Sequence, residues 1–184
     1  MPPSDAAVAL LARAYAFAAV QHEGQKRNAS GDEPYLHHLI EVANLLAYAT
    51  DGGNPVLVAA GVLHDVLEDT PTTATELRTL FGHDVATLVG EVTDPKGLSE
   101  DERRKRQVEH VRVLSPEAKL LKIADKTSNI RERLKARPEG QSDRDILDYV
   151  EWGAMVVAGC RGLNTKLDEV FDEAYEAALR KYGG

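Results

Sequence analysis

The stretch GVLHDVLEDT, residues 61–70, places one histidine and three carboxylates among apolar residues at helical spacing. His64 and Asp65 are followed four positions later by Glu68 and Asp69, so a helix would carry these polar groups close together. Like charges at this spacing repel each other, and the valines and leucines beside them indicate a buried environment where unpaired charges are costly. A bound metal ion would neutralise the carboxylates. The rest of the sequence must then supply its other ligands.

The rest of the sequence predicts helices joined by short turns. Apolar residues recur at helical spacing in most segments, and no stretch shows the sustained alternation of a strand. Helices are expected over residues 5–22, 37–49, 55–70, 74–82, 83–92, 99–114, 115–136, 142–159 and 163–181, with a loop over 25–35. We therefore expect an all-α fold, a compact multi-helix bundle in which residues 1–184 form a single domain.

The composition is ordinary for a soluble protein but has an acidic balance. The chain has 184 residues, of which 43% are hydrophobic, and a net charge of −8. That charge argues against a nucleic-acid partner, and we expect neither a signal segment nor a membrane partner. The single Cys160 cannot form an internal disulfide, which favours the reducing cytoplasm as the compartment.

Basic residues nevertheless gather at three places in the sequence. Lys26 and Arg27 stand together in the predicted loop, the run RRKR occupies 103–106, and further lysines and arginines are spread over 119–133. Such clusters can bind a small anionic substrate despite the negative net charge. Because three acidic residues directly precede RRKR, we expect that run to be an exposed, solvated helix face.

Two further segments offer metal ligands. His37 and His38 begin an apolar helix, and Asp125 follows an apolar run in another helix, with Asn129 one turn later. A lone buried Asp is commonly a structural group, but an upstream His-Asp pair that needs another ligand favours metal binding. A second His-Asp pair, at residues 83–84, stands at a helix junction, where the chemistry of helix termini accounts for it without a metal.

Four segments of the sequence stand out together. They are HEGQKRNASGDEPYLHH (22–38), AAGVLHDVLEDT (59–70), FGHDVATLVGEVTD (81–94) and KLLKIADKTSNIRE (119–132). In combination they resemble the hydrolase domain of the RelA/SpoT family of HD-domain, metal-dependent phosphohydrolases. The short chain is similar to the small alarmone hydrolases of the MESH1-like type. The resemblance extends over roughly residues 6–180 and implies a helical HD-domain bundle.

The resemblance also implies roles for the polar residues. The implied metal ligands are His38, His64, Asp65 and Asp125, and the acids implied to activate and orient water are Glu68 and Asp69. The residues implied to contact the nucleotide or its phosphates are Lys26, Arg27, Asn129, Arg131 and Tyr149. The family implies Mn²⁺, which suits a site of two imidazoles and two carboxylates, although Zn²⁺ and Fe²⁺ suit such a set as well.

The function implied by the resemblance is hydrolysis of the 3′-pyrophosphate of ppGpp or pppGpp, giving GDP or GTP and pyrophosphate. The expected partner is thus a small guanine nucleotide, and the sequence leaves the oligomeric state open. One alternative is an HD-type phosphohydrolase that acts on another 3′-phosphorylated or deoxy nucleotide. Another is a non-catalytic nucleotide-binding module, against which the presence of both Glu68 and Asp69 argues.

Overall fold

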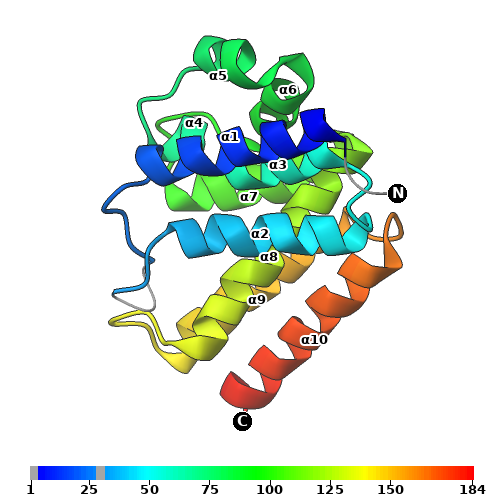
Figure 1. Cartoon of the computed structure of the whole chain (residues 1–184). Coiled ribbons are helices and arrows are strands. Elements are labelled where there is room, and N and C mark those ends of the chain that lie inside the picture. Colours follow the sequence, from blue (N-terminus) through cyan, green and yellow to red (C-terminus); the bar gives the residue numbers. More distant parts are fainter. Residues whose placement is uncertain (1–3, 28–31) are drawn as a thin grey trace.

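The computed structural model describes residues 4–27 and 32–184, and it has the predicted all-α fold (Figure 1). The helices are α1 (Asp5–Gln21), α2 (Leu36–Ala49), α3 (Pro55–Leu63), α4 (Val66–Asp69), α5 (Ala74–Phe81), α6 (His83–Val92), α7 (Glu100–His110), α8 (Pro116–Lys135), α9 (Asp143–Ala158) and α10 (Thr165–Tyr182), with a 3₁₀ turn, η1 (Val111–Val113). Residues 28–31 of the predicted loop lie outside the described part. Among the described helices, none is long and apolar enough to cross a lipid bilayer.

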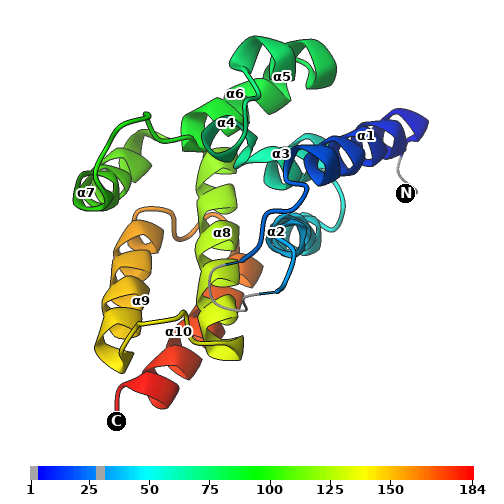
Figure 2. The same cartoon turned by 90° about the vertical axis from the view of Figure 1, so that its left-hand side faces the viewer.

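Helix α8 is the axis around which the other elements pack. It contacts α2, α3, α6, α9 and α10, and Figure 2 shows it upright in the centre, with α1–α3 on one side and α7 and α9 on the other. The helix begins as its sequence indicates, since Ser115 Oγ accepts a hydrogen bond from the backbone N–H of Ala118 and Pro116 stands in the first turn. Its buried face joins the apolar cluster of the core. Polar residues on that face therefore lie close to several other elements.

The prediction of one continuous helix over residues 55–70 is wrong. Helix α3 ends and α4 begins on either side of a turn formed by His64 and Asp65. The turn satisfies its own polar groups: the imidazole Nδ1 of His64 lies 2.9 Å from the carbonyl oxygen of Gly61, and two backbone N–H groups of α4 donate to the carbonyl of Asp65. In a continuous helix, adjacent side chains diverge by about 100°. At the turn both residues keep αR backbone angles, and His64 Nε2 lies 3.1 Å from Asp65 Oδ2.

Helix α7 lies at the edge of the bundle, and none of its residues is buried. It begins with a reciprocal capping box between Ser99 and Glu102, and it packs against η1 and α9. Because it buries so little apolar surface, its attachment depends on polar contacts.

Candidate metal centre and active-site cavity

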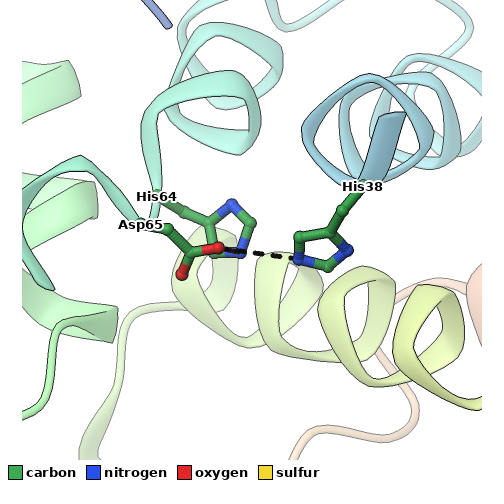
Figure 3. A group of neighbouring side chains, drawn as sticks. All are labelled: His38, His64 and Asp65. Atoms are coloured by element: carbon green, nitrogen blue, oxygen red, sulfur yellow. Dashed lines mark ion pairs between the residues drawn. The ribbon is translucent and has the colours of Figure 1, made fainter. Parts of the chain in front are cut away.

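Side chains from three parts of the chain converge between α2, the α3–α4 turn and α8. His38 comes from α2, and His64 and Asp65 come from the turn; Figure 3 shows these three pointing toward one another, with one donor atom from each within 4.8 Å of the others. Asp125 reaches the same point from α8. The Nε2 atoms of His38 and His64 lie 3.6 and 3.1 Å from Asp65 Oδ2, and 3.4 and 3.7 Å from Asp125 Oδ1. The structure thus brings the four predicted ligands into one cluster.

Hydrogen bonds on the far side of each imidazole aim its Nε2 atom into this cluster. Nδ1 of His64 faces the carbonyl of Gly61, and because a carbonyl only accepts, Nδ1 carries the proton. Nδ1 of His38 lies 2.9 Å from Ser128 Oγ. Among the described residues, His64 Nε2 is buried without a hydrogen bond of good geometry. A buried ring nitrogen left in this way is suited to coordinate an ion.

The two carboxylates of the cluster are oriented as well. Tyr35 donates its O–H to Asp65 Oδ2 at 2.6 Å, and burial followed by the charge of Asp65 raises the tyrosine pKa, so it remains a donor. Asn129 donates to Asp125 Oδ1 at 2.6 Å, and Lys126 Nζ lies 3.0 Å from the other Asp125 oxygen. Outer partners of this kind fix the geometry of metal ligands.

The charges within the cluster stabilise one another. Burial alone would lower the pKa of His64, but Asp65 and Asp125 raise it to about 9. Burial also opposes ionisation of both carboxylates, yet their neighbours hold each pKa below its ordinary value: the two histidines do so for Asp65, and Lys126 does so first for Asp125. The carboxylates therefore attract positive charge to this point, and a divalent cation would compete there with protons.

The donor set fits one divalent transition-metal ion. Imidazole nitrogens and carboxylate oxygens are ligands that such ions accept. Two ligands bound at about 2.1 Å, at angles between square and tetrahedral, are about 3.0–3.4 Å apart. The measured separations of 3.1, 3.4, 3.6 and 3.7 Å are close to that range.

Glu68 and Asp69 line the same cavity as the donor cluster. Glu68 Oε1 accepts a 2.6 Å hydrogen bond from the backbone N–H of Asp94, which holds the carboxylate in place. Burial raises the pKa of both Glu68 and Asp69, and the negative charge of Asp65 adds to the effect. A carboxylate whose pKa is raised toward neutrality is a more effective general base than an ordinary one.

Basic side chains line this cavity beside the acids. They are Arg103, Arg104, Lys122 and Lys126. Both lysines are buried, and Lys122 donates to the carbonyl of Val92 at 2.8 Å. Burial lowers the pKa of Lys122. Burial would also lower the pKa of Lys126, but the negative charge of Asp125 raises it above its ordinary value. As predicted, RRKR stands on an exposed helix, since no residue of α7 is buried, but it is not only a solvated face. The contact of α7 with α9, where Trp152 Nε1 donates to the Arg104 carbonyl at 3.1 Å, brings the first two arginines to the cavity.

A second hollow adjoins the first and contains most of the predicted substrate residues. The residues that line both hollows are Tyr35, Asp69, Arg103, Asn129 and Tyr149. Lys26 and Arg27 line the second hollow, Lys26 with an exposed side chain and Arg27 with a buried one. Arg131 lines neither hollow, and its Nη1 lies 3.4 Å from Glu41 Oε1. The structure therefore places four of the five predicted substrate residues along one surface and Arg131 elsewhere.

The second His-Asp pair lies away from this cavity. His83 and Asp84 begin α6, are exposed, and line a separate hollow. Asp84 stands in the first turn, where a carboxylate faces the positive end of the helix dipole. This placement agrees with the helix-terminus interpretation.

Several residues that contact the site were not singled out from the sequence. Tyr35 and Glu41 stand three residues before and after His38, and Ser128 stands three residues after Asp125. That spacing puts side chains on one helical face, so it is a signal that could have marked Glu41 and Ser128. Asp94 has no such signal, because its partner Glu68 is far away in the sequence and meets it only through packing.

The chain is similar in sequence to proteins of known family. The sequence matches the HD-domain family over residues 14–148. It is 41% identical over 168 residues to the human guanosine-3′,5′-bis(diphosphate) 3′-pyrophosphohydrolase MESH1, covering 91% of this chain and 94% of that one. It is 37% identical over 172 residues to the bifunctional (p)ppGpp synthase/hydrolase SpoT of Escherichia coli K12, covering 89% of this chain and 24% of that protein.

The fold is also similar to a solved structure. That structure is described as a metazoan ortholog of SpoT that hydrolyzes ppGpp and plays a role in starvation responses. The two share a TM-score of 0.88 and 34% sequence identity, and the match covers 100% of this chain and 98% of the other. Sequence, fold and donor cluster together lead to one conclusion: the chain belongs to the HD-domain family and, within it, to the MESH1 group.

Proposed function

We propose that this protein hydrolyses the 3′-pyrophosphate of ppGpp and pppGpp, giving GDP or GTP and pyrophosphate. One observation carries the proposal: the donor cluster, two acids and four basic side chains line a single cavity. Phosphoryl transfer depends mainly on positioning and charge neutralisation, and this cavity offers both. The similarity to proteins named as ppGpp 3′-pyrophosphohydrolases supports the same substrate.

The four residues of the donor cluster would hold one divalent ion, and we propose Mn²⁺ because half of the set is hard carboxylate. Bound there, such an ion would lower the pKa of a water molecule and polarise a phosphoryl oxygen. Glu68 takes a proton from the attacking water as the water oxygen bonds to the phosphorus next to the ribose, and Asp69 orients that water. The bond from this phosphorus to the ribose 3′ oxygen breaks and pyrophosphate is released; the 3′ oxygen takes up one proton, which balances the proton that the water gave to Glu68.

The basic side chains of the two hollows would bind different parts of the substrate. Lys122 and Lys126, both beside the donor cluster, would neutralise the 3′-pyrophosphate. The second hollow would receive the nucleoside and its 5′-phosphates against Lys26, Arg27 and two of the residues that line both hollows, Asn129 and Tyr149. We leave Arg131 out of this assignment because its guanidinium faces Glu41.

Product identification tests the proposal. Metal-free protein is reconstituted with Mn²⁺ and incubated with ppGpp, and the products are separated by anion-exchange chromatography. We expect GDP and pyrophosphate in equal amounts. Intact ppGpp, together with hydrolysis of another 3′-phosphorylated or deoxy nucleotide, would overturn the substrate and favour the alternative hydrolase. The kcat/KM values across such a panel decide between the two.

We also propose that residues 1–184 form one domain and work in the cytoplasm. A single buried thiol and a continuous apolar cluster support this. A one-domain protein should unfold in one cooperative transition. Two separate transitions in calorimetry of the metal-loaded protein would contradict it.

A further inference from the structure

We propose that Ser128 is a positioning residue for the metal centre, because its hydroxyl determines which nitrogen of His38 faces the ion. Ser128 lies on α8 and is fully buried. Its Oγ lies 2.9 Å from His38 Nδ1 and 2.7 Å from Glu41 Oε2, so it connects two residues of α2. The inference rests on the proposed function only in requiring that the donor cluster bind a metal.

The direction of these two hydrogen bonds follows from counting protons. A serine hydroxyl has one proton to donate, and a carboxylate has none. The Glu41 carboxylate pairs with two cations, at 3.8 Å from the Arg27 guanidinium and 3.4 Å from that of Arg131, and its Oε2 faces the Ser128 hydroxyl at 2.7 Å. The Ser128 proton is therefore donated to Glu41. Toward His38, Ser128 Oγ is left as an acceptor, and His38 Nδ1 must carry the proton.

This protonation leaves the lone pair of His38 Nε2 free toward the cluster. Nε2 faces Asp65 Oδ2 at 3.6 Å and Asp125 Oδ1 at 3.4 Å. In the other tautomer, an N–H would point at the ion and exclude His38 as a ligand. The tautomer that the hydroxyl selects is thus the one that can coordinate a metal.

The two histidines obtain the same orientation by different means. His64 is held by the backbone carbonyl of Gly61, which no substitution of a side chain removes. His38 depends on the Ser128 side chain, and loss of the hydroxyl would leave a buried N–H without its acceptor and Glu41 without this donor. Loss of such an outer partner typically costs about 10- to 100-fold in metal affinity.

The test compares Ser128→Ala with Thr127→Val. Thr127 is the adjacent residue on α8, is equally buried, and donates its hydroxyl to the carbonyl of Ile123 in its own helix. Metal-free proteins are titrated with Mn²⁺, and binding is followed by electron paramagnetic resonance. We expect a Kd about 10- to 100-fold higher for S128A and an unchanged Kd for T127V.

Equal affinities for the two variants would overturn the role of Ser128 and leave the proposed function standing. Absence of Mn²⁺ binding by the unsubstituted protein would overturn the proposed function and this inference with it. A second measurement does not require S128A to fold. In long-range ¹H–¹⁵N spectra of the unsubstituted, metal-free protein, we expect a protonated Nδ1 in His38; an unprotonated Nδ1 would overturn the inference.

Discussion

The backbone N–H of Asp94 donates a 2.6 Å hydrogen bond to Oε1 of Glu68. The side chain of the same Asp94 accepts hydrogen bonds from Arg106 and Gln107 on α7, at 3.0 and 2.5 Å. Asp94 thus joins the proposed general base to a helix that buries none of its own residues and brings two arginines to the cavity. The two connections use different parts of the residue, so a substitution can separate them.

Asp94→Ala should loosen α7 while leaving Glu68 its backbone donor. Hydrogen bonds to charged groups contribute about 1.5–3 kcal/mol each, and α7 has little apolar burial to compensate for their loss. We expect the KM for ppGpp to rise about tenfold, which corresponds to 1.4 kcal/mol, with a smaller change in kcat. Fluorescence of Trp152, the single tryptophan, should shift to the red because its N–H bonds the Arg104 carbonyl.

The matched control for α7 is Glu109→Ala. Glu109 lies on the same helix, in an exposed ion pair with Lys105 at 3.9 Å. It should alter neither KM nor the fluorescence. If Asp94→Ala and Glu109→Ala behave alike, Asp94 does not hold α7.

Glu68→Gln should abolish most turnover without loss of metal. The amide oxygen of Gln can still accept the Asp94 N–H, but it cannot take a proton from water. Loss of a general base lowers kcat by about 10²- to 10⁴-fold. Single-turnover kinetics measure the loss of turnover, and metal analysis of the purified variant checks that the ion is retained. Unchanged turnover would remove Glu68 from the mechanism and reopen the role of Asp69.

Removal of the metal should destabilise the α3–α4 turn first. There the carboxylates of the cluster would lose the charge that offsets their repulsion. At 100 times its Kd, a bound ion stabilises the folded state by about 2.7 kcal/mol, so a chelator should lower the Tm. Hydrogen exchange should increase first within residues 61–70. His64→Ala should lose bound metal, whereas His83→Ala, in the other His-Asp pair, should keep it; equal losses would contradict the assignment.

Arg27→Ala should lower the free energy of unfolding strongly. Arg27 is 4% exposed and lies 2.9 Å from Glu132 and 3.8 Å from Glu41, so its loss leaves two carboxylates facing a buried site without that charge. Breaking a buried ion pair by removing one partner costs about 3–5 kcal/mol. Urea denaturation measures the change. Lys26→Ala, beside it but exposed, should leave stability unchanged, and equal effects of the two substitutions would refute this difference.

The Cys160 thiol should be inert in the folded protein near neutral pH. Burial raises its pKa to about 12, and the side chain is 1% exposed. The reactive thiolate is therefore scarce, and a disulfide reagent at about pH 8 should modify Cys160 only after unfolding. The folded pKa lies above the unfolded one, so the stability linked to this thiol is complete below about pH 9 and declines as the pH rises further. Fast labelling of the native protein would contradict this.

Sequence patterns predicted the helices well where the determinants are local. Apolar spacing and caps such as Ser115 depend on neighbouring residues, which the sequence displays directly. The same reasoning failed at His64 and Asp65, because the helix pattern continues through them while the backbone turns. At this turn the His64 ring lies within hydrogen-bond distance of the Gly61 carbonyl, a contact that periodicity does not report.

The sequence by itself determined the donor types, the helical fold class and the family resemblance, since residue identity and local periodicity suffice for these. Only the tertiary structure decided which side chains contact the donor residues and line the cavity. The packing of α2 against α8 brings Ser128 to His38, and the position of α7 turns two of its arginines toward the cavity. Hydrogen-bond direction and cavity lining depend on groups far apart in the chain, so their physical cause is packing and not local pattern.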